Sequence, residues 1–461
     1  MSAPTVAIVG GGITGLVAAR EVAQGLQGSG RVLLLEASDR LGGKVFTGSL
    51  AGVPVEAGAD WFVTRRPEAL ELCRELGLEE ELVPPARSGA LLWTGGRALP
   101  LPTRQVRGVP LEPIEAARAG LISEEGARDA AAGLDRHERL TGPDVSVAEL
   151  VRGRLGREIL ERLVDPMLSA SRAGSPDELS LAAAAPELDH AAREHDTLGA
   201  GLATVAPQAG SDVPPFLGLR GGMEALVHAL HARTKGVEWR TGARVERVRQ
   251  EEEGAFELET SGGVERAEAV VVCAPAPVTA RLLEELSPDA AREIGPIRYS
   301  PAAVIALEYA PEAGSAPDHG SGILVPSVED TALVACAWYS AKWAHAATTD
   351  GSTIVRAFAG RSNDDRALAL EDDELVQRIA TEVSMVTGLT GEPRTHSLVR
   401  WPDALPVYEV GHLERVTRIE DAVGSIANLR VAGAGYSGSG LPDCIAQGRA
   451  AARKIVESLS R

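Results

Sequence analysis

The stretch T-V-A-I-V-G-G-G-I-T-G-L, residues 5–16, decides the fold. Residues 6–9 form a short apolar, β-branched run of the kind that makes a strand buried on both faces. The glycines that follow fit G-x-G-x-x-G, and residues 16–23 have helical patterning. A second apolar run, residues 31–35, leads directly into Glu36. This order of strand, glycine turn, helix, strand and acid predicts a dinucleotide-binding βαβ unit.

Each glycine of this motif has its own expected task. One allows a tight turn, one lets the backbone approach a pyrophosphate, and one lets helix and strand pack closely. The helix N-terminus offers free N–H groups and a positive dipole end to the phosphates. Glu36 is placed to accept from a ribose hydroxyl, and its charge disfavours a 2′-phosphate. The predicted contacts are Gly10, Gly11, Gly12, Ile13, Thr14, Gly15, Leu16 and Glu36.

The composition is typical of a globular protein with two or three domains. The chain has 461 residues, more than one ordinary core accommodates, and 44% are hydrophobic. No apolar run reaches the ~18–20 residues that a membrane helix needs. Because no basic and then apolar leader precedes Thr5, we expect a cytoplasmic protein without a transmembrane segment. The net charge of −19 and the lack of a basic stripe argue against nucleic-acid binding.

The cysteines and histidines give no metal or disulfide pattern. The four cysteines, Cys73, Cys273, Cys336 and Cys444, lack C-x-x-C spacing, and the nine histidines form no paired ligand motif. We therefore expect no metal, no iron–sulfur cluster and no disulfide framework, and we expect Cys444 to be a small buried side chain.

A second glycine-rich segment follows Glu36 at once. It reads A-S-D-R-L-G-G-K over residues 37–44, and E-A-G-A-D-W-F follows over residues 56–62. An ordinary NAD dehydrogenase needs neither segment, whereas small residues permit close backbone approach to something flat. Here the sequence resembles the FAD-dependent amine oxidase superfamily, in which both segments wrap the cofactor. The resemblance implies FAD contacts at Ala37, Arg40, Gly42, Gly43, Lys44, Ala57, Gly58, Ala59 and Asp60.

The superfamily pattern returns twice more along the chain. A G-G-M turn at residues 221–223 opens a helix, and strands are predicted at 237–240, 243–248, 256–260 and 269–274. The resemblance implies that the Val245 backbone contacts the adenine edge and that Ala274 is the last cofactor contact in this second FAD-binding segment. The stretch V-A-G-A-G-Y at 431–436 and the start of a last helix within 437–448 form the final return. They imply contacts at Gly433, Ala434, Ser439, Gly440 and Leu441.

The predicted fold class is α/β, with a discontinuous Rossmann-type FAD-binding domain and two additions on the substrate side. The FAD-binding segments are expected at residues 1–95, 215–275 and 412–461. Residues from about 111 to 206 are rich in Ala, Leu and Glu with helical patterning and predict a helical insert within residues 96–214, followed by a polar connection from Pro207 to Pro215. Residues from about 296 to 410 alternate strands with one helix, so a sheet-based substrate domain is expected at residues 276–411.

Two stretches near the C-terminus narrow the family. R-W-P-D-A-L-P-V-Y-E-V-G-H at 400–412 resembles the R-W-x-x-A-x-P-x-Y-x-x-G-H run of porphyrinogen oxidases, and G-S-G-L-P-D-C-I-A-Q-G at 438–448 resembles their ending. The chain is identified as a member of the protoporphyrinogen/coproporphyrinogen oxidase family, which implies that Trp401 packs near the flavin. Because residues 431–436 contain no cysteine for a covalent link, we expect noncovalent FAD.

The resemblance implies a six-electron oxidation of a porphyrinogen to a porphyrin, in which dioxygen is consumed and hydrogen peroxide is released. No catalytic side chain is expected, because the flavin carries the chemistry. Substrate propionates call for arginine forks, for which Arg65 and Arg66 are the candidates, and Tyr436 is assigned to the substrate side. A transient contact with the next heme-pathway enzyme is the expected protein partnership.

Three alternatives stay open at this point. The absence of a spanning segment and the acidic charge favour coproporphyrinogen III over protoporphyrinogen IX as substrate. An amine or polyamine oxidase would instead use Tyr408 and Tyr436 as an aromatic cage for an amine. A non-enzymatic FAD-binding regulator would keep the cofactor and have no substrate.

Overall fold

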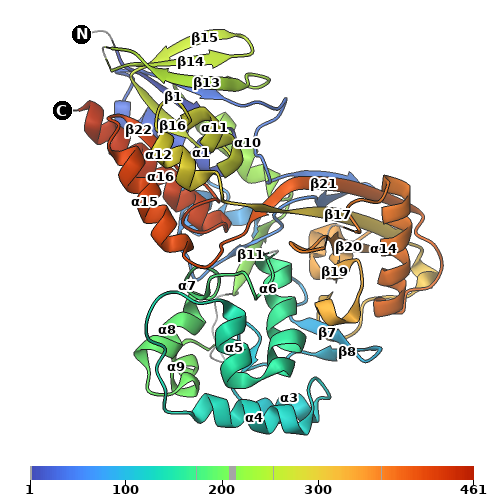
Figure 1. Ribbon diagram of the computed structural model, residues 1–461. Helices are drawn as coiled ribbons and strands as arrows, with labels where there is room; N and C mark the ends of the chain where they lie inside the picture. The colour runs from blue at the N-terminus through green and yellow to red at the C-terminus, as the bar shows by residue number, and fades with distance from the viewer. Residues whose placement is uncertain (1–2, 173, 207–213, 253, 365, 461) are drawn as a thin grey trace.

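The computed structural model describes residues 3–172, 174–206, 214–252, 254–364 and 366–460, which form three adjoining bodies (Figure 1). A nucleotide-binding body carries both chain ends, a sheet body extends to one side of it, and a helical body lies below both. Most of the connection predicted from Pro207 to Pro215 lies outside the described residues. None of the helices in the described ranges has both the length and the apolar character that crossing a membrane would require.

The nucleotide-binding body is built on a five-stranded parallel sheet, which confirms the predicted α/β fold class. Its strand order is β12-β2-β1-β16-β22, and all four pairings are parallel. Strands from three separated parts of the chain therefore meet in one sheet. The strands are β1 (Thr5–Val9), β2 (Arg31–Leu35), β12 (Val237–Arg240), β16 (Ala269–Val272) and β22 (Leu429–Val431).

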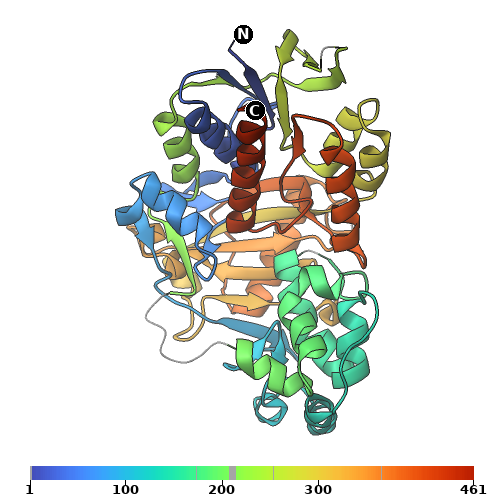
Figure 2. The ribbon, with the colours of Figure 1, turned by 90° about the vertical axis from the view of Figure 1, so that its left-hand side faces the viewer.

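Helices cover both faces of this sheet because its central strands are apolar on both sides. Helix α1 (Ile13–Leu26) packs against the long last helix α16 (Leu441–Leu459), and Figure 2 shows the two side by side. The same face carries α2 (Glu68–Glu75) and α10 (Glu224–Arg233). The other face carries α11 (Ala276–Leu283), α12 (Pro288–Ile294), α15 (His412–Gly424), β13 (Val245–Gln250), β14 (Phe256–Thr260) and β15 (Gly263–Ala267).

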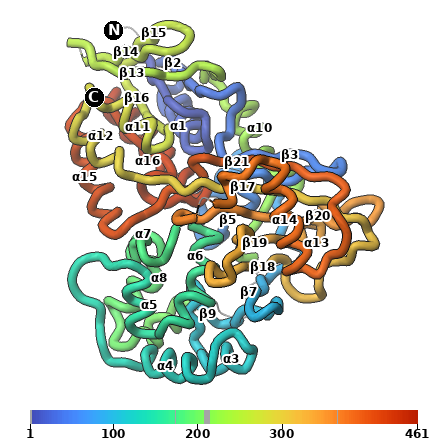
Figure 3. The backbone as a smooth tube through the Cα atoms, turned by 45° about the vertical axis from the view of Figure 1, so that its right-hand side comes forward, coloured from blue at the N-terminus to red at the C-terminus, as the bar shows by residue number. Residues whose placement is uncertain are grey.

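The second body is a seven-stranded sheet in the order β21-β17-β20-β19-β18-β7-β8, with α14 (Asp372–Thr387) packed on one face. Two long strands, β17 and β21, run antiparallel from the nucleotide-binding body into this sheet (Figure 3). The strands are β7 (Ala90–Thr94), β8 (Arg97–Pro100), β17 (Tyr299–Tyr309), β18 (Gly322–Leu324), β19 (Leu333–Trp338), β20 (Thr353–Ala359) and β21 (Thr395–Pro406).

One predicted boundary needs correction at this sheet. The first FAD-binding segment was expected to end at residue 95, which lies inside the β7–β8 hairpin. Strand β7 pairs in parallel with β18, so the whole hairpin belongs to the second sheet. The local turn at Gly95-Gly96 was readable from the sequence, but the partner of the hairpin is more than 200 residues away along the chain and leaves no local signal.

The third body confirms the predicted helical insert. Its helices are α3 (Pro113–Arg118), α4 (Glu124–Asp135), α5 (Val147–Leu155), α6 (Asp165–Arg172), α7 (Leu181–Ala184), α8 (Pro186–Glu194) and α9 (Leu198–Val205), with a π-helical stretch at Ile159–Val164 before α6. Four of the helices begin at a hydroxyl side chain that accepts from a backbone N–H of the first turn, a favourable N-cap. These N-caps are Ser123, Ser146, Ser180 and Thr197.

Short strands connect the bodies. They are β3 (Thr47–Leu50), β4 (Val53–Glu56), β5 (Phe62–Val63), β6 (Leu82–Val83), β9 (Gln105–Val106), β10 (Val109–Pro110) and β11 (Phe216–Leu219), with α13 (Tyr339–Lys342) after β19. Strand β11 pairs with both β5 and β6, so the chain that leaves the helical body returns beside the segment that entered it.

Candidate functional site

The glycines between β1 and α1 divide into packed and open positions. A Cβ on Gly15 would lie 1.9 Å from the carbonyl oxygen of Gly10, and Gly10 itself has a φ of +109°. A Cβ on Gly12 would instead meet no atom within 4 Å. Gly10 and Gly15 therefore close the turn against the helix, and Gly12 faces open space at the helix N-terminus.

The N-terminus of α1 is free to bind an anion. Its N-cap, Gly12, has no side chain to cap the first turn, and that turn contains no acidic residue. The first backbone N–H groups of a helix lack partners inside the helix and carry the positive end of its dipole. Open space above uncapped N–H groups fits a phosphate group, so the residues present fit the predicted dinucleotide.

Glu36 holds the glycine turn in place. One carboxylate oxygen accepts from the Gly11 N–H at 2.6 Å, and the other accepts from the backbone and hydroxyl of Ser38, both at 2.7 Å. A carboxylate oxygen can accept a further hydrogen bond, so these contacts leave room for the predicted ribose hydroxyl.

The second glycine segment is bound directly to the first. The Gly42 N–H donates to the Gly11 carbonyl at 2.8 Å, and a Cβ on Gly43 would lie 3.2 Å from the Cα of Gly12. Arg40 was predicted to contact the cofactor, but its guanidinium donates to the carbonyls of Gly43 and Leu41 and stacks 4.4 Å over the Phe46 ring. Arg40 therefore shapes this loop from within the protein.

Lys44 is a largely buried cation that lies over the ring of Tyr299, with 4.8 Å between its Nζ and the ring centroid. Burial lowers the pKa of Lys44 from 10.5 to about 8. A largely buried ammonium that stacks on a ring is suited to an anionic ligand.

Residues 57–60 pack against the backbone of the Lys44 segment. A Cβ on Gly58 would lie 1.9 Å from the carbonyl oxygen of Lys44, so only glycine fits there. Two side chains of the second sheet and one of α13 hold this segment by its backbone and by the side chain of Asp60. The Trp401 indole donates to the Ala57 carbonyl at 2.7 Å, and Arg356 donates to the carbonyls of Glu56 and Gly58. Lys342 binds the Asp60 carboxylate at 2.8 Å.

The role of the Asp60 side chain differs from the predicted cofactor contact. Its carboxylate forms ion pairs with Lys342 and with Arg356, whose nearest nitrogen lies 3.4 Å away. Because a buried carboxylate is costly when it has no partner, these two cations stabilise it. The two cations hold the pKa of Asp60 below its usual value of 3.8. Neither cation was singled out from the sequence, although Arg356 stands in the otherwise apolar run T-I-V-R-A-F-A of β20, which is the signal that could have found it.

Glu56, next to this segment, is a buried carboxyl without a close ion pair. Its oxygens accept from the Met223 N–H at 2.5 Å and from the Thr47 hydroxyl at 2.9 Å. Burial raises the pKa of Glu56 from 4.5 to about 7, against the opposing effect of these hydrogen bonds.

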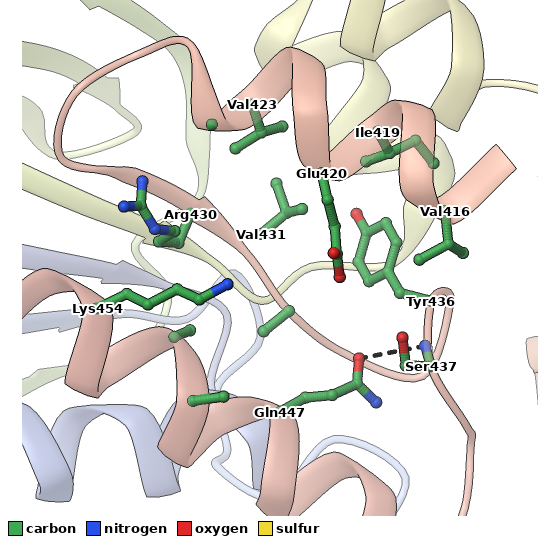
Figure 4. A pocket seen from close by; sticks show the side chains of 14 residues that line it. Val416, Ile419, Glu420, Val423, Arg430, Val431, Tyr436, Ser437, Gln447 and Lys454 are labelled. Carbon is green, nitrogen blue, oxygen red and sulfur yellow. Dashed lines mark hydrogen bonds between the residues drawn. The ribbon is translucent and has the colours of Figure 1, made fainter. Parts of the chain in front are cut away.

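The C-terminal segment is held in a loop by Gln447 of α16. Its amide oxygen accepts from the N–H of Ser437, as Figure 4 shows, and from the N–H of Gly433. Its amide nitrogen donates to the Gly438 carbonyl at 3.0 Å. A Cβ on Gly433, at a φ of +142°, would meet nothing within 4 Å. The loop thus presents open backbone, and the N-cap of α16, Gly440, also lacks a side-chain cap.

Tyr408 and His412 support the same loop from the R-W…G-H stretch. The Tyr408 hydroxyl donates to the Ala434 carbonyl at 2.5 Å, and the ring stacks on His412 with centroids 4.1 Å apart. The His412 ring lies 2.8 Å from the Tyr436 carbonyl. Tyr408 is only 2% exposed and one face of its ring lies against His412, so it offers little open surface to an amine.

Tyr436 does not lie where the substrate assignment expected it. Its side chain is only 5% exposed and packs in the core between the sheet and α15. The ring borders a cavity of about 260 Å³ between α15 and α16, where Figure 4 draws it next to Val416, Ile419 and Glu420 of α15. Cys444 is buried as expected, and burial raises its thiol pKa to about 11.

The two arginines predicted to hold propionates already have carboxylate partners. Arg65 pairs with Glu187 of α8 at 2.7 Å, and Arg66 pairs with Glu68 at 2.9 Å and with Asp443 of α16 at 3.0 Å. They lie where the nucleotide-binding and helical bodies meet. Of the other predicted cofactor contacts, Val245 is the first residue of β13, and Ala274 lies two residues after the end of β16.

Comparisons with known proteins agree along nearly the whole chain. The family described as flavin containing amine oxidoreductase matches residues 13–456. Coproporphyrinogen III oxidase of Bacillus subtilis (strain 168) is 32% identical over 458 residues, which cover 97% of this chain and 96% of that protein. The protein of the same name from Mycobacterium tuberculosis (strain ATCC 25618 / H37Rv) is 33% identical over 453 residues, covering 98% and 97%. A solved structure of a candidate protoporphyrinogen oxidase from Exiguobacterium sp. 255-15 superimposes with a TM-score of 0.89 at 30% identity, covering 100% of both chains.

Two glycine substitutions should separate folding from cofactor binding. We expect Gly15→Ala to lower the free energy of unfolding of the flavin-free protein by about 1–3 kcal/mol, because its Cβ overlaps the Gly10 carbonyl. Gly12→Ala should cost no more than about 1 kcal/mol of stability, a helix-cap effect. It should nevertheless weaken flavin binding about tenfold or more, because its Cβ enters the open space. Urea unfolding and flavin titration measure both, and full flavin affinity in Gly12→Ala would show that the cofactor does not occupy that space.

The raised pKa of Glu56 predicts a pH dependence of stability. The folded protein binds this proton more tightly than the unfolded chain, so the carboxyl costs increasing stability as pH rises from about 4.5 to about 7. Glu56→Gln removes that cost, and its thermal midpoint should gain on the wild type between pH 5 and pH 8. Glu115→Gln, exposed on α3, is the control. A Glu56→Gln difference that stays flat with pH would contradict the assignment.

Proposed function

The chain belongs to the flavin containing amine oxidoreductase family, and from this premise we propose that it oxidises coproporphyrinogen III to coproporphyrin III with FAD as its cofactor. The substrate is suggested by full-length relatives of that name at 32% and 33% identity. The observation that carries the cofactor is the packing of two other glycine-bearing segments, at Gly42–Gly43 and at Gly448 of α16, against the first turn of the uncapped helix α1.

We assign the parts of FAD to residues by the chemistry that each part requires. The N–H groups at the start of α1 and the Lys44 ammonium suit the pyrophosphate. Glu36 suits the ribose hydroxyls, and the Val245 backbone suits the adenine. The flat ring system is assigned to residues 57–59 and 439–441. Trp401 and Arg356 hold the first of these segments by hydrogen bonds to its backbone carbonyls. The absence of cysteine in residues 431–436 supports noncovalent binding.

When bound, the flavin would supply the two-electron oxidation three times per substrate, and dioxygen would receive the electrons as hydrogen peroxide. The protein's part is to position the substrate and to exclude water. No side chain is assigned as a general base, and the buried Cys273 and Cys444 are not nucleophiles, because burial raises both thiol pKa values.

The choice of substrate is between two porphyrinogens that differ in charge. Coproporphyrinogen III has four propionates, whereas protoporphyrinogen IX has two propionates and two vinyl groups. The second substrate remains a candidate through the likeness to the Exiguobacterium structure. An amine oxidase is disfavoured, because Tyr408 is bonded to the Ala434 carbonyl and Tyr436 is buried in the core. A cytoplasmic location and contact with the next heme-pathway enzyme are parts of the same proposal.

The proposal is tested by supplying each porphyrinogen to the purified, flavin-loaded protein. We expect porphyrin fluorescence, oxygen uptake and peroxide to rise together, with kcat/KM at least about tenfold higher for coproporphyrinogen III, since a site built for carboxylates rejects analogues that lack them. Protein inactivated by heat measures the spontaneous oxidation. No porphyrin above that background would overturn the proposal, and peroxide released from amines would favour the amine oxidase.

A further inference from the structure

Arg172, the last residue of α6, lies where the helical body meets the loop before α16. Its Nη1 lies 3.4 Å from the hydroxyl oxygen of Ser439, which is a long hydrogen bond. Its Nε is shielded from solvent and donates to nothing. Among the described residues, no carboxylate lies within ion-pair distance of this guanidinium. Arg172 is therefore a partly buried cation, and the protein leaves its shielded Nε without an acceptor.

The carboxylates around Arg172 are already engaged by other arginines. Glu187 accepts from both Arg65 and Arg107, at 2.7 Å and 3.1 Å. Asp443 is paired with Arg66 at 3.0 Å. Arg107 also repels Arg172, and together with burial it lowers the pKa of Arg172. The junction between the helical body and the α16 loop thus has a surplus of positive charge.

Other buried arginines of the chain show how such groups are normally satisfied. Arg356 donates to two backbone carbonyls and pairs with Asp60, and Arg20 pairs with Glu75 at 2.7 Å. A guanidinium has five N–H donors, and burying it without partners is costly. The C-terminal end of α6 favours a cation through the helix dipole. The dipole does not give the free N–H groups of the guanidinium any hydrogen-bond acceptor.

We propose that Arg172 receives a carboxylate of the substrate and determines the preference for a tetracarboxylic porphyrinogen. This inference rests on the function proposed above. Ser439 belongs to the segment assigned to the flavin, so an anion held by Arg172 belongs to a molecule that lies between the helical body and the flavin. A carboxylate matches the guanidinium fork, whereas a vinyl group at the same place would leave the cation unpaired.

The test compares Arg172→Gln, Arg172→Lys and the wild type. A matched control is Arg128→Gln, which removes the same charge from the exposed face of α4 at the far end of the helical body (Figure 1). We expect Arg172→Gln to raise KM for coproporphyrinogen III by about 10- to 100-fold, far more than it lowers kcat. KM for protoporphyrinogen IX should rise less, and Arg172→Lys should recover part of the loss, because it keeps the charge without the fork.

Two further readouts separate a substrate contact from other roles of Arg172. Binding of the product coproporphyrin III, followed by its fluorescence, should weaken in Arg172→Gln, whereas its tetramethyl ester should bind the variant and the wild type alike. The flavin content and reduction potential should stay at wild-type values. If Arg172→Gln fails to fold, Arg172→Lys carries the test, with a several-fold rise in KM expected.

The outcomes distinguish the two proposals. If the wild type makes no porphyrin, the proposed function fails and this inference fails with it. If the wild type is active and both Arg172 variants keep its KM and its affinity for coproporphyrin III, only the role of Arg172 is overturned. A shifted flavin potential with unchanged KM would likewise overturn it and would place Arg172 against the cofactor.

Discussion

The contact of backbone with backbone at the first glycine turn is the constraint on which the rest of the structure depends. The Gly42 N–H reaches the Gly11 carbonyl at 2.8 Å, and the Gly15 Cα lies so close to the Gly10 carbonyl that no Cβ fits between them. Such approaches are possible only without side chains. They leave the N-terminus of α1 uncapped and facing open space at Gly12, and residues 42–43 and Gly448 pack against the same turn.

A second constraint links the nucleotide-binding body to the second sheet. Arg356, only 3% exposed, holds the backbone on both sides of Ala57 and shares Asp60 with Lys342. Removing one partner from such a buried group leaves an uncompensated charge, which typically costs about 3–5 kcal/mol. The segment assigned to the flavin ring is thus fixed by the sheet that we assign to the substrate side, so the two sides of the site are positioned as one unit.

The sequence predicted what depends on local pattern. The β1–α1–β2 unit, the helical insert and the strands of the second sheet follow from periodicity and glycine spacing, and the structure has them. Side-chain partners far apart in the chain were not predictable in this way. Lys342 and Asp60 are separated by 282 residues, and no pattern near either residue indicates the other. The same limit misplaced the β7–β8 hairpin and put Tyr436 on the substrate side. Arg40 differs, because its partners are nearby backbone carbonyls at Leu41 and Gly43, which no side-chain pattern marks.

The central claim is that separated segments of the chain form one site for noncovalent FAD, and the most direct measurement is the identity of the flavin in the purified protein. Acid precipitation separates released flavin from covalently attached flavin, and mass spectrometry identifies both. The account predicts one FAD per chain in the supernatant and no flavin on the precipitated protein. Flavin that remains attached to the chain, FMN in place of FAD, or a protein that binds no flavin when FAD is supplied would contradict it.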